Sequence, residues 1–242
     1  MMVRPTRIRN CLALMALVFA RFVAGAQSKG PEAFVEVQAH VNVLAPRSGA
    51  HPPVAVLWLK PLSRTPPQTF TPNGRYTLLQ KDRMFHPHLL VIPVGSVVRF
   101  PNADPFFHNV FSLFNGKRFD LGLYEAGSAK EVDFSREGVS YIFCNIHPEM
   151  SAVVLALSTR LYGLSDSNSN FVIRKVPAGE YEMHIWIEGF TQPVLDRLMR
   201  RVNVVPGAGN LGIVDASGIS TQPEGHLNKF GQPYDQDSKP PY

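Results

Sequence analysis

Cysteine is scarce in this chain of 242 residues: only Cys11 and Cys144 are present, and no Cys-x-x-Cys-His motif occurs. The absence of that motif excludes a covalently attached haem of the c type. The sequence also lacks a glycine-rich phosphate loop, a Ser/His/Asp set and paired acids at spacings typical of enzymes. No apolar run approaches the roughly 20 residues that a membrane-spanning helix requires. These absences disfavour haem proteins, phosphate-binding enzymes, hydrolases and membrane-spanning proteins.

The first 26 residues have the three parts of a secretory signal peptide. Three arginines precede the apolar run at residues 11–20, and the Ala-Gly-Ala at residues 24–26 provides a cleavage site before Gln27. The alternative, a buried N-terminal helix, does not explain these three parts together. We therefore expect a bacterial protein that is periplasmic or secreted after cleavage near Ala26, without stable membrane insertion.

Removal of this segment changes the charge and the cysteine content. Four of the 24 basic residues and none of the 19 acidic residues lie in residues 1–26, which leaves 20 basic residues against 19 acidic ones. A nearly neutral chain gives no support for nucleic-acid binding. Cys144 then remains as a single thiol in an oxidising compartment, where it needs burial or occupation by a ligand.

Short runs of β-branched and aromatic residues, bounded by Gly, Pro, Asn or Asp, fill most of the sequence after Gln27. They include FVEVQAHVNV, AVLWLKPL, HLLVIPVGSVVRF, KEVDFSREGVSYIFC, SAVVLAL, NFVIRKV and YEMHIWIEG. Such runs are typical of strands. Only residues 194–201 have helical spacing. The pattern predicts an all-β chain of sandwich architecture.

The stretch CNIHPEM places Cys144, His147 and Met150 on one short loop between two predicted strands. Thiolate, imidazole and thioether suit a blue copper site, in which two histidines and a cysteine are capped by a weak axial methionine. His108, in PFFHNVF, is the candidate for the second histidine. Zinc fits less well because a thioether is a poor zinc ligand.

The stretches GSVVRFPNADPFFHNV and CNIHPEM resemble the cupredoxins, the blue copper family of plastocyanin and amicyanin. The matching positions are Gly95, Val98, Phe100, Asn102 and Asp104, the pair His108-Asn109, and the Cys-x-x-His-Pro-x-Met loop. The resemblance covers about residues 80–157 and implies a Greek-key β-sandwich. It also implies one type 1 copper held by His108, Cys144, His147 and Met150.

The same resemblance implies a carrier of single electrons rather than an enzyme, with a redox protein such as a cytochrome or dehydrogenase as partner. It implies that Asn109 hydrogen-bonds near Asn145 and braces the ligand loop, although Asn145 stands where Ser or Thr is common. The ring of His147 is expected to be the edge through which electrons leave. Phe106 and Phe107 are either an apolar docking patch beside it or core residues.

A second resemblance begins at DSNSNFVIRKVPAGEYEMHIWIEGF, which is similar to the latter half of a carboxypeptidase-regulatory-like (transthyretin-like) β-sandwich. Its missing first strands are expected at residues 33–62, so the cupredoxin unit is predicted to be inserted into this sandwich. The combination also resembles bacterial methylamine-utilisation-like proteins. In chain order we expect a signal peptide at 1–26, N-terminal strands at 27–79, a cupredoxin domain at 80–157, a carboxypeptidase-regulatory-like sandwich at 158–215 and a disordered tail at 216–242.

Among three alternatives to an electron carrier, a copper store or chaperone and a metal-free sandwich remain open. A multicopper oxidase is disfavoured, because His86 and His88 form the only His-x-His motif and Cys144 has no histidine beside it. A periplasmic copper store or chaperone is expected to be richer in methionine than this chain, in which four methionines follow the signal segment. A metal-free structural β-sandwich is the third.

Overall fold

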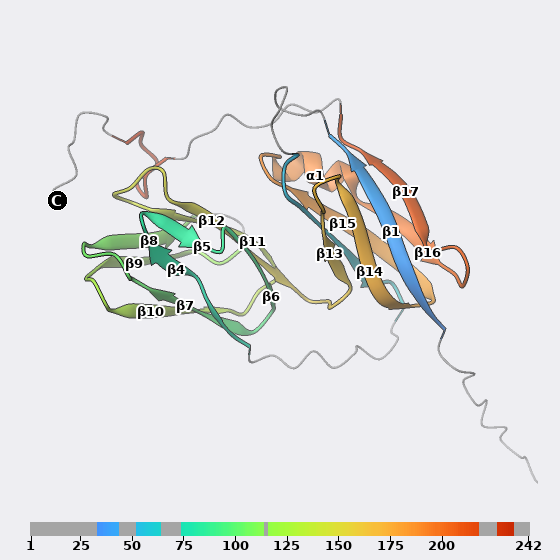
Figure 1. The fold of residues 1–242 in the computed structure, drawn as a ribbon, viewed down its shortest axis with the longest axis horizontal. Coiled ribbons are helices and arrows are strands. Elements are labelled where there is room, and N and C mark those ends of the chain that lie inside the picture. The colour runs from blue at the N-terminus through green and yellow to red at the C-terminus, as the bar shows by residue number, and fades with distance from the viewer. Residues whose placement is uncertain (1–32, 44–51, 64–73, 114–115, 218–226, 235–242) are drawn as a thin grey trace, which may run out of the picture. The chain divides into compact units, whose positions relative to one another are not determined.

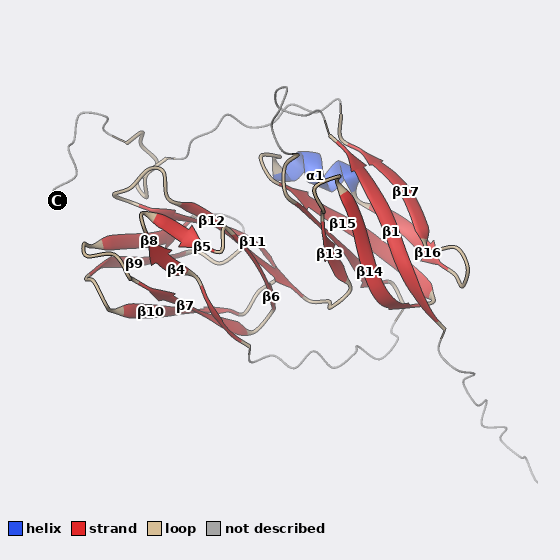
Figure 2. Ribbon diagram, viewed as in Figure 1, coloured by secondary structure: helices blue, strands red, loops and turns tan. Residues whose placement is uncertain are grey.

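A computed structural model describes residues 33–43, 52–63, 74–113, 116–217 and 227–234 (Figure 1). In these residues the chain is all-β except for one short helix, α1 (Gln192–Leu198), as Figure 2 shows. No helix in the described part is long and apolar enough to cross a membrane. The all-β prediction is therefore confirmed, while the predicted signal peptide lies outside the described residues.

One pair of sheets joins strands from the two ends of the chain. The three-stranded sheet has the order β14-β1-β17, and the four-stranded sheet has the order β13-β2-β15-β16. The bounds are β1 Phe34–Asn42, β2 Ala55–Pro61, β13 Tyr162–Leu164, β14 Asn170–Pro177, β15 Gly179–Ile187, β16 Arg200–Val204 and β17 Asn210–Asp215. Both sheets contribute to one hydrophobic cluster, so they form the two layers of a β-sandwich.

Hydrophobic alternation explains why these strands bury one face. In β1 every second side chain is buried, from Val35 to Val41, while the residues between them are mainly exposed. Helix α1 begins at Gln192 with a proline in its first turn. It is shorter than the predicted helical segment 194–201, because the last part of that segment already belongs to β16.

The second pair of sheets lies between these strands in the sequence. The five-stranded sheet has the order β6-β12-β11-β8-β9, and the three-stranded sheet has the order β10-β7-β3. A small hairpin joins β4 and β5. The bounds are β3 Arg75–Thr77, β4 Leu79–Lys81, β5 Met84–His86, β6 Leu89–Pro93, β7 Ser96–Pro101, β8 His108–Ser112, β9 Phe119–Tyr124, β10 Ala129–Phe134, β11 Gly138–Cys144 and β12 Ser151–Leu157.

Strand β12 is buried on both faces, which accounts for its uninterrupted apolar sequence SAVVLAL. Val153, Leu155 and Leu157 belong to the cluster that contains β1 and β2. Ala152 and Val154 belong instead to the cluster between the five-stranded and three-stranded sheets. A strand with two buried faces has no polar alternation. This strand therefore serves both hydrophobic cores.

The pairing of β1 and β2 bears on the predicted domain arrangement. β1 pairs with β14 and β17, and β2 pairs with β13 and β15, all of which follow residue 160. This is the pairing that a sandwich split around residues 80–157 requires. The domain boundaries themselves stay a prediction.

Residues 227–234 differ from the expectation of a disordered tail. They form a compact turn in which Asn228 Oδ1 accepts the N–H groups of Phe230 and Gln232, both at 3.0 Å. The N–H of Lys229 donates to the side chain of Asn145 at 3.0 Å. The other residues of the predicted tail after 217 lie outside the described residues.

Candidate metal centre

Two neighbouring strands and one loop carry the predicted ligands. His108 is the first residue of β8, and Cys144 is the last residue of β11, which pairs with β8 through Cys144 and Val110. The turn after β11 is closed by two backbone bonds: Met150 N–H donates to His147 O at 3.0 Å, and Cys144 N–H to Met150 O at 3.3 Å. The Cys-x-x-His-Pro-x-Met spacing therefore folds into a turn that returns directly into β12.

The structure brings His108, Cys144 and His147 into one buried triangle. Sγ of Cys144 lies 3.6 Å from Nδ1 of His108 and 3.5 Å from Nδ1 of His147, and the two Nδ1 atoms are 3.1 Å apart. The exposed fractions are 0%, 0% and 3% for His108, Cys144 and His147. A point equidistant from the three atoms lies about 2.0 Å from each, close to the roughly 2.0–2.3 Å of metal–nitrogen and metal–sulfur bonds to such a transition metal. The three side chains are therefore placed to serve as three ligands of one metal ion.

The outer nitrogen of His108 is held by a carboxylate. Nε2 of His108 lies 2.9 Å from Oδ2 of Asp104, so its N–H donates to the carboxylate and Nδ1 faces the triangle with its lone pair. Asp104 also accepts the backbone N–H groups of Asp82 at 2.6 Å and Arg83 at 3.1 Å. Both of those residues have positive φ, at 55° and 54°, and such backbone is uncommon outside glycine. One carboxylate thus fixes a turn and a ligand together.

Burial sets the protonation of the metal-free site. Burial raises the pKa of the Cys144 thiol above its ordinary value. It lowers the pKa of both His108 and His147, in His108 despite the opposing hydrogen bond to Asp104. The metal-free centre therefore holds a thiol and two neutral imidazoles, and a metal that binds there must displace the thiol proton.

Asp104 itself stays charged. Burial alone raises its pKa, but the hydrogen bonds from His108 and from two backbone N–H groups outweigh burial and lower the pKa below its ordinary 3.8. A carboxylate beside a neutral imidazole increases the basicity of that ligand.

Met150 occupies the fourth predicted position. It is fully buried and belongs to the same hydrophobic cluster as Cys144, directly before β12. Its assignment as axial ligand stays a prediction.

The two predicted bracing residues are joined through the backbone rather than through their side chains. Asn145 N–H donates to Asn109 O at 2.9 Å. The amide of Asn109 instead donates to Asp120 Oδ1 at 2.6 Å, and Asn145 Oδ1 accepts the N–H of Lys229. The expected proximity is present, but each side chain has a different partner, and the bracing role stays a prediction.

An aromatic ring covers the two histidines. The ring of Phe106 lies 5.3 Å from that of His108 and 5.5 Å from that of His147, measured between centroids. The guanidinium of Arg83 lies 5.3 Å above the same phenylalanine. His147 is buried, and the exit of electrons through its ring edge stays a prediction.

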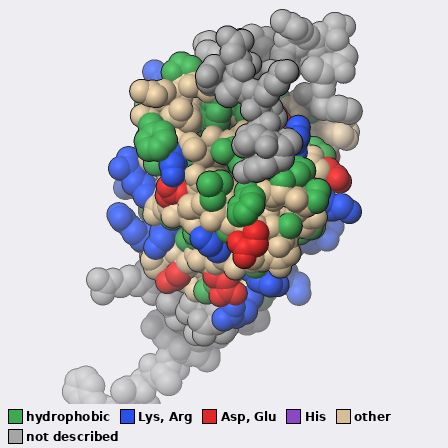
Figure 3. All heavy atoms as spheres, turned by 90° about the vertical axis from the view of Figure 1, so that its left-hand side faces the viewer, with side chains coloured by type: hydrophobic (Ala, Val, Ile, Leu, Met, Phe, Trp, Pro, Cys, Tyr) green, Lys and Arg blue, Asp and Glu red, His purple; other side chains and the backbone are tan. Residues whose placement is uncertain are grey.

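Phe107, in contrast, is 41% exposed. The two phenylalanines therefore differ: Phe106 packs on the ligands, and Phe107 reaches the surface. Figure 3 shows the face that forms the left side of Figure 1, where hydrophobic side chains are exposed among charged ones. A docking role for Phe106 and Phe107 stays a prediction.

Sequence reasoning assigned no role to Asp104, Asp120 or the segment 227–234. Asp104 belongs to the motif that carries the cupredoxin resemblance, and its position four residues before His108 is a usable signal. Asp120 and Tyr234 offer no such signal, because their contacts with Lys229 and Cys144 join residues that are far apart in the chain.

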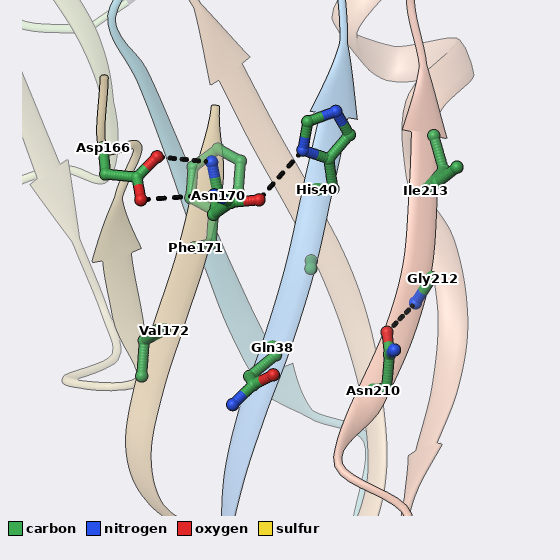
Figure 4. A pocket seen from close by; sticks show the side chains of 10 residues that line it. Gln38, His40, Asp166, Asn170, Phe171, Val172, Asn210, Gly212 and Ile213 are labelled. Atoms are coloured by element: carbon green, nitrogen blue, oxygen red, sulfur yellow. Dashed lines mark hydrogen bonds between the residues drawn. The ribbon is translucent and has the colours of Figure 1, made fainter. Parts of the chain in front are cut away.

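A separate hollow of about 440 Å³ lies on the sheet β14-β1-β17, away from every predicted ligand (Figure 4). Its polar side chains bond mainly to one another: Nδ1 of His40 lies 3.0 Å from Oδ1 of Asn170, and Asn170 also donates to Asp166. His86 and His88 of the His-x-His motif are exposed and likewise lie outside the triangle. The described residues thus hold one group of the metal-ligand type, at Cys144.

No protein-family model and no curated protein matches the chain. Solved structures similar to part of it are cupredoxins. A purple cupredoxin from Nitrosopumilus maritimus is 28% identical, with 34% of this chain and 99% of that chain covered and a TM-score of 0.31. A reduced amicyanin variant is 20% identical, with 35% and 83% covered and a TM-score of 0.33. At such TM-scores the likeness carries no argument about function.

Proposed function

We propose that this protein is an exported blue copper protein that carries single electrons between redox partners and is not itself an enzyme. The observation that supports the proposal most directly is the buried triangle of Cys144, His108 and His147. Two imidazoles and one thiolate are the equatorial ligands of type 1 copper. Bound copper would supply a one-electron couple at this point.

The chain's own residues keep the triangle in place. Asp104 holds the tautomer and orientation of His108, and the two backbone bonds of the turn between Cys144 and Met150 hold the other ligands. Phe106 packs against both imidazoles and limits the access of water. Such preorganisation leaves little to rearrange when the charge of the site changes by one electron.

The finer features of the proposal follow the cupredoxin resemblance of the sequence. Met150 is the axial ligand, and the centre is a type 1 copper site in a cupredoxin domain. The protein acts in the bacterial periplasm or outside the cell, and its partner is another redox protein, either a cytochrome or a dehydrogenase. The sandwich of β1, β2 and β13–β17 is its carboxypeptidase-regulatory-like scaffold.

Copper storage or delivery is the main alternative. A protein that hands over copper needs ligands that a recipient can reach, whereas His108 and Cys144 are fully buried and His147 nearly so. Burial therefore favours a centre that keeps its metal.

A copper titration of the processed protein separates these functions. We expect one Cu(II) per chain and an intense visible charge-transfer band from thiolate to copper. The band should disappear in Cys144→Ser and should persist in His40→Gln, a control that changes a half-buried histidine of β1 outside the triangle. Colourless tight binding of Cu(I) alone would support storage, and the absence of stoichiometric binding would leave a metal-free structural protein.

A further inference from the structure

The described C-terminal residues 227–234, here called the clasp, lie against the loop that carries the thiol. The hydroxyl of Tyr234 donates to the backbone oxygen of Cys144 at 2.8 Å. The N–H of Lys229 donates to Oδ1 of Asn145 at 3.0 Å. In Figure 1 the clasp is the segment at the red end of the colour range near the C label. Residues about 90 positions apart in the chain thus meet at one ligand.

The clasp also reaches the strand that carries His108. Nζ of Lys229 lies 2.8 Å from Oδ2 of Asp120, while Oδ1 of the same carboxylate accepts the amide of Asn109 at 2.6 Å. Asn109 follows His108 directly in β8. The carboxylate of Asp120 therefore links the clasp to Asn109 of β8. The backbone oxygen of Asn109 in turn accepts the N–H of Asn145, which follows Cys144 at the end of β11.

The clasp has an ordered structure of its own. Asn228 Oδ1 accepts two backbone N–H groups, and two further backbone bonds close the turn between Asn228 and Gln232. Gly231 has a φ of 76°, a conformation that glycine adopts without strain. A turn that is already closed loses less conformational entropy when it docks than a free tail does.

Hydrogen bonds and an ion pair join the clasp to the residues around the thiol. Phe230, its largest apolar side chain, is 73% exposed. Burial raises the pKa of Tyr234, so its hydroxyl remains a donor. Burial alone raises the pKa of Asp120, but the hydrogen bonds from Lys229 and Asn109 outweigh burial and lower that pKa. This carboxylate therefore remains charged. Charge-assisted bonds of this kind are stronger than neutral ones.

We propose that the clasp positions the ligand loop and thereby restricts access to the Cys144 thiol and slows the loss of copper. Tyr234 and Lys229 are positioning residues: they hold the backbone of Cys144 and the side chains beside the ligands without contacting the metal. The part of this inference that concerns copper loss rests on the proposed copper function. The part that concerns access to the Cys144 thiol does not, because it applies equally to the metal-free protein.

The test compares the full-length double variant Tyr234→Phe/Lys229→Gln with the wild type. The first measurement is the rate at which an aromatic disulfide reagent modifies the thiol in the metal-free protein. We expect a rise of about tenfold or more, since the variant loses the Tyr234 hydrogen bond and the Lys229–Asp120 ion pair, each of which opposes opening of the loop. The second is the rate at which a strong chelator removes copper from the loaded protein, which should rise in parallel.

A matched control, Tyr162→Phe/Lys175→Gln, changes the same residue types at positions outside the clasp, and it should leave both rates unchanged. Wild-type thiol reactivity in the clasp variant, with circular dichroism unchanged, would overturn the proposal. The single variant Tyr234→Phe decides the case if the double variant folds poorly, because it removes one oxygen only. If the wild type binds no copper, the proposed function fails, while thiol reactivity still decides whether the clasp exists.

Discussion

Asp104 and His108 form a buried pair in which the imidazole N–H donates to the carboxylate over 2.9 Å. The pair leaves the other nitrogen of His108 facing Cys144 at 3.6 Å. A negative group four residues before a ligand thus sets the tautomer of that ligand and adds charge that favours the more oxidised metal.

Replacement of this carboxylate should weaken the site and raise its potential. In Asp104→Asn the orientation of His108 is held less firmly and the nearby negative charge is lost, so we expect copper affinity to fall about 10–100-fold. Competition with a copper chelator measures the affinity, and a redox titration measures the potential. Asp133→Asn, an exposed change in β10, should alter neither. An unchanged affinity in Asp104→Asn would mean that the pair has no part in the site.

The axial assignment of Met150 predicts an effect on potential without a large effect on the fold. Met150→Leu keeps the buried volume and should cost less than about 1.5 kcal/mol in the free energy of unfolding. Loss of an axial donor disfavours Cu(II), so the reduction potential should rise. Met183→Leu is the matched control, because Met183 is equally buried but belongs to the other hydrophobic cluster. A potential that does not change in Met150→Leu would remove the axial role.

The metal-free protein should lose stability below about pH 6.5. The folded-state pKa values of His108 and His147 are lowered from 6.5, so their contribution is complete above that pH and is lost as the pH falls through the folded values. The pKa of Asp104 is lowered too, so its carboxylate stays charged at this stage of the acid titration.

Urea unfolding between pH 7.5 and pH 5 measures this dependence. The slope of the free energy of unfolding against pH should be smaller in His147→Gln, which lacks one of the two groups. Equal slopes in the variant and the wild type would show that the imidazole does not titrate as the burial of the site implies.

Because the two faces of β12 lie in different hydrophobic clusters, we expect that a substitution on one face can lower stability without changing the metal site. Leu155→Ala removes a side chain that is 1% exposed and should lower the free energy of unfolding by about 2–5 kcal/mol. Its side chain belongs to the cluster away from Cys144, so the copper spectrum of the folded protein should persist. Leu164→Ala, at a 48% exposed position, should change stability by less than about 0.5 kcal/mol. A small effect of Leu155→Ala would contradict the packing.

The sequence alone indicated that His108, Cys144 and His147 lie together, because these residue types form an unusual set. Cys144 and His147 lie three residues apart, so a single turn brings them together, and His108 is marked by the His-Asn pair that follows the motif ending at Asp104. The strands were predictable for the same reason, since alternation and turn residues are local signals.

The surroundings of the site were less predictable because they depend on distant contacts. The burial of His147 results from packing against Phe106, which spacing does not reveal. The side chain of Asn109 donates to Asp120 rather than to Asn145, and the same carboxylate binds Lys229, which is distant in the chain. Nothing in the polar sequence around Tyr234 indicates that its hydroxyl bonds to Cys144.

The most direct test of an electron carrier is a reversible redox titration of the copper-loaded protein. We expect that one electron per chain bleaches the visible band, that reoxidation restores it fully, and that the protein retains its copper through repeated cycles. Release of copper on reduction, or failure of the band to return, would show that the protein does not carry single electrons.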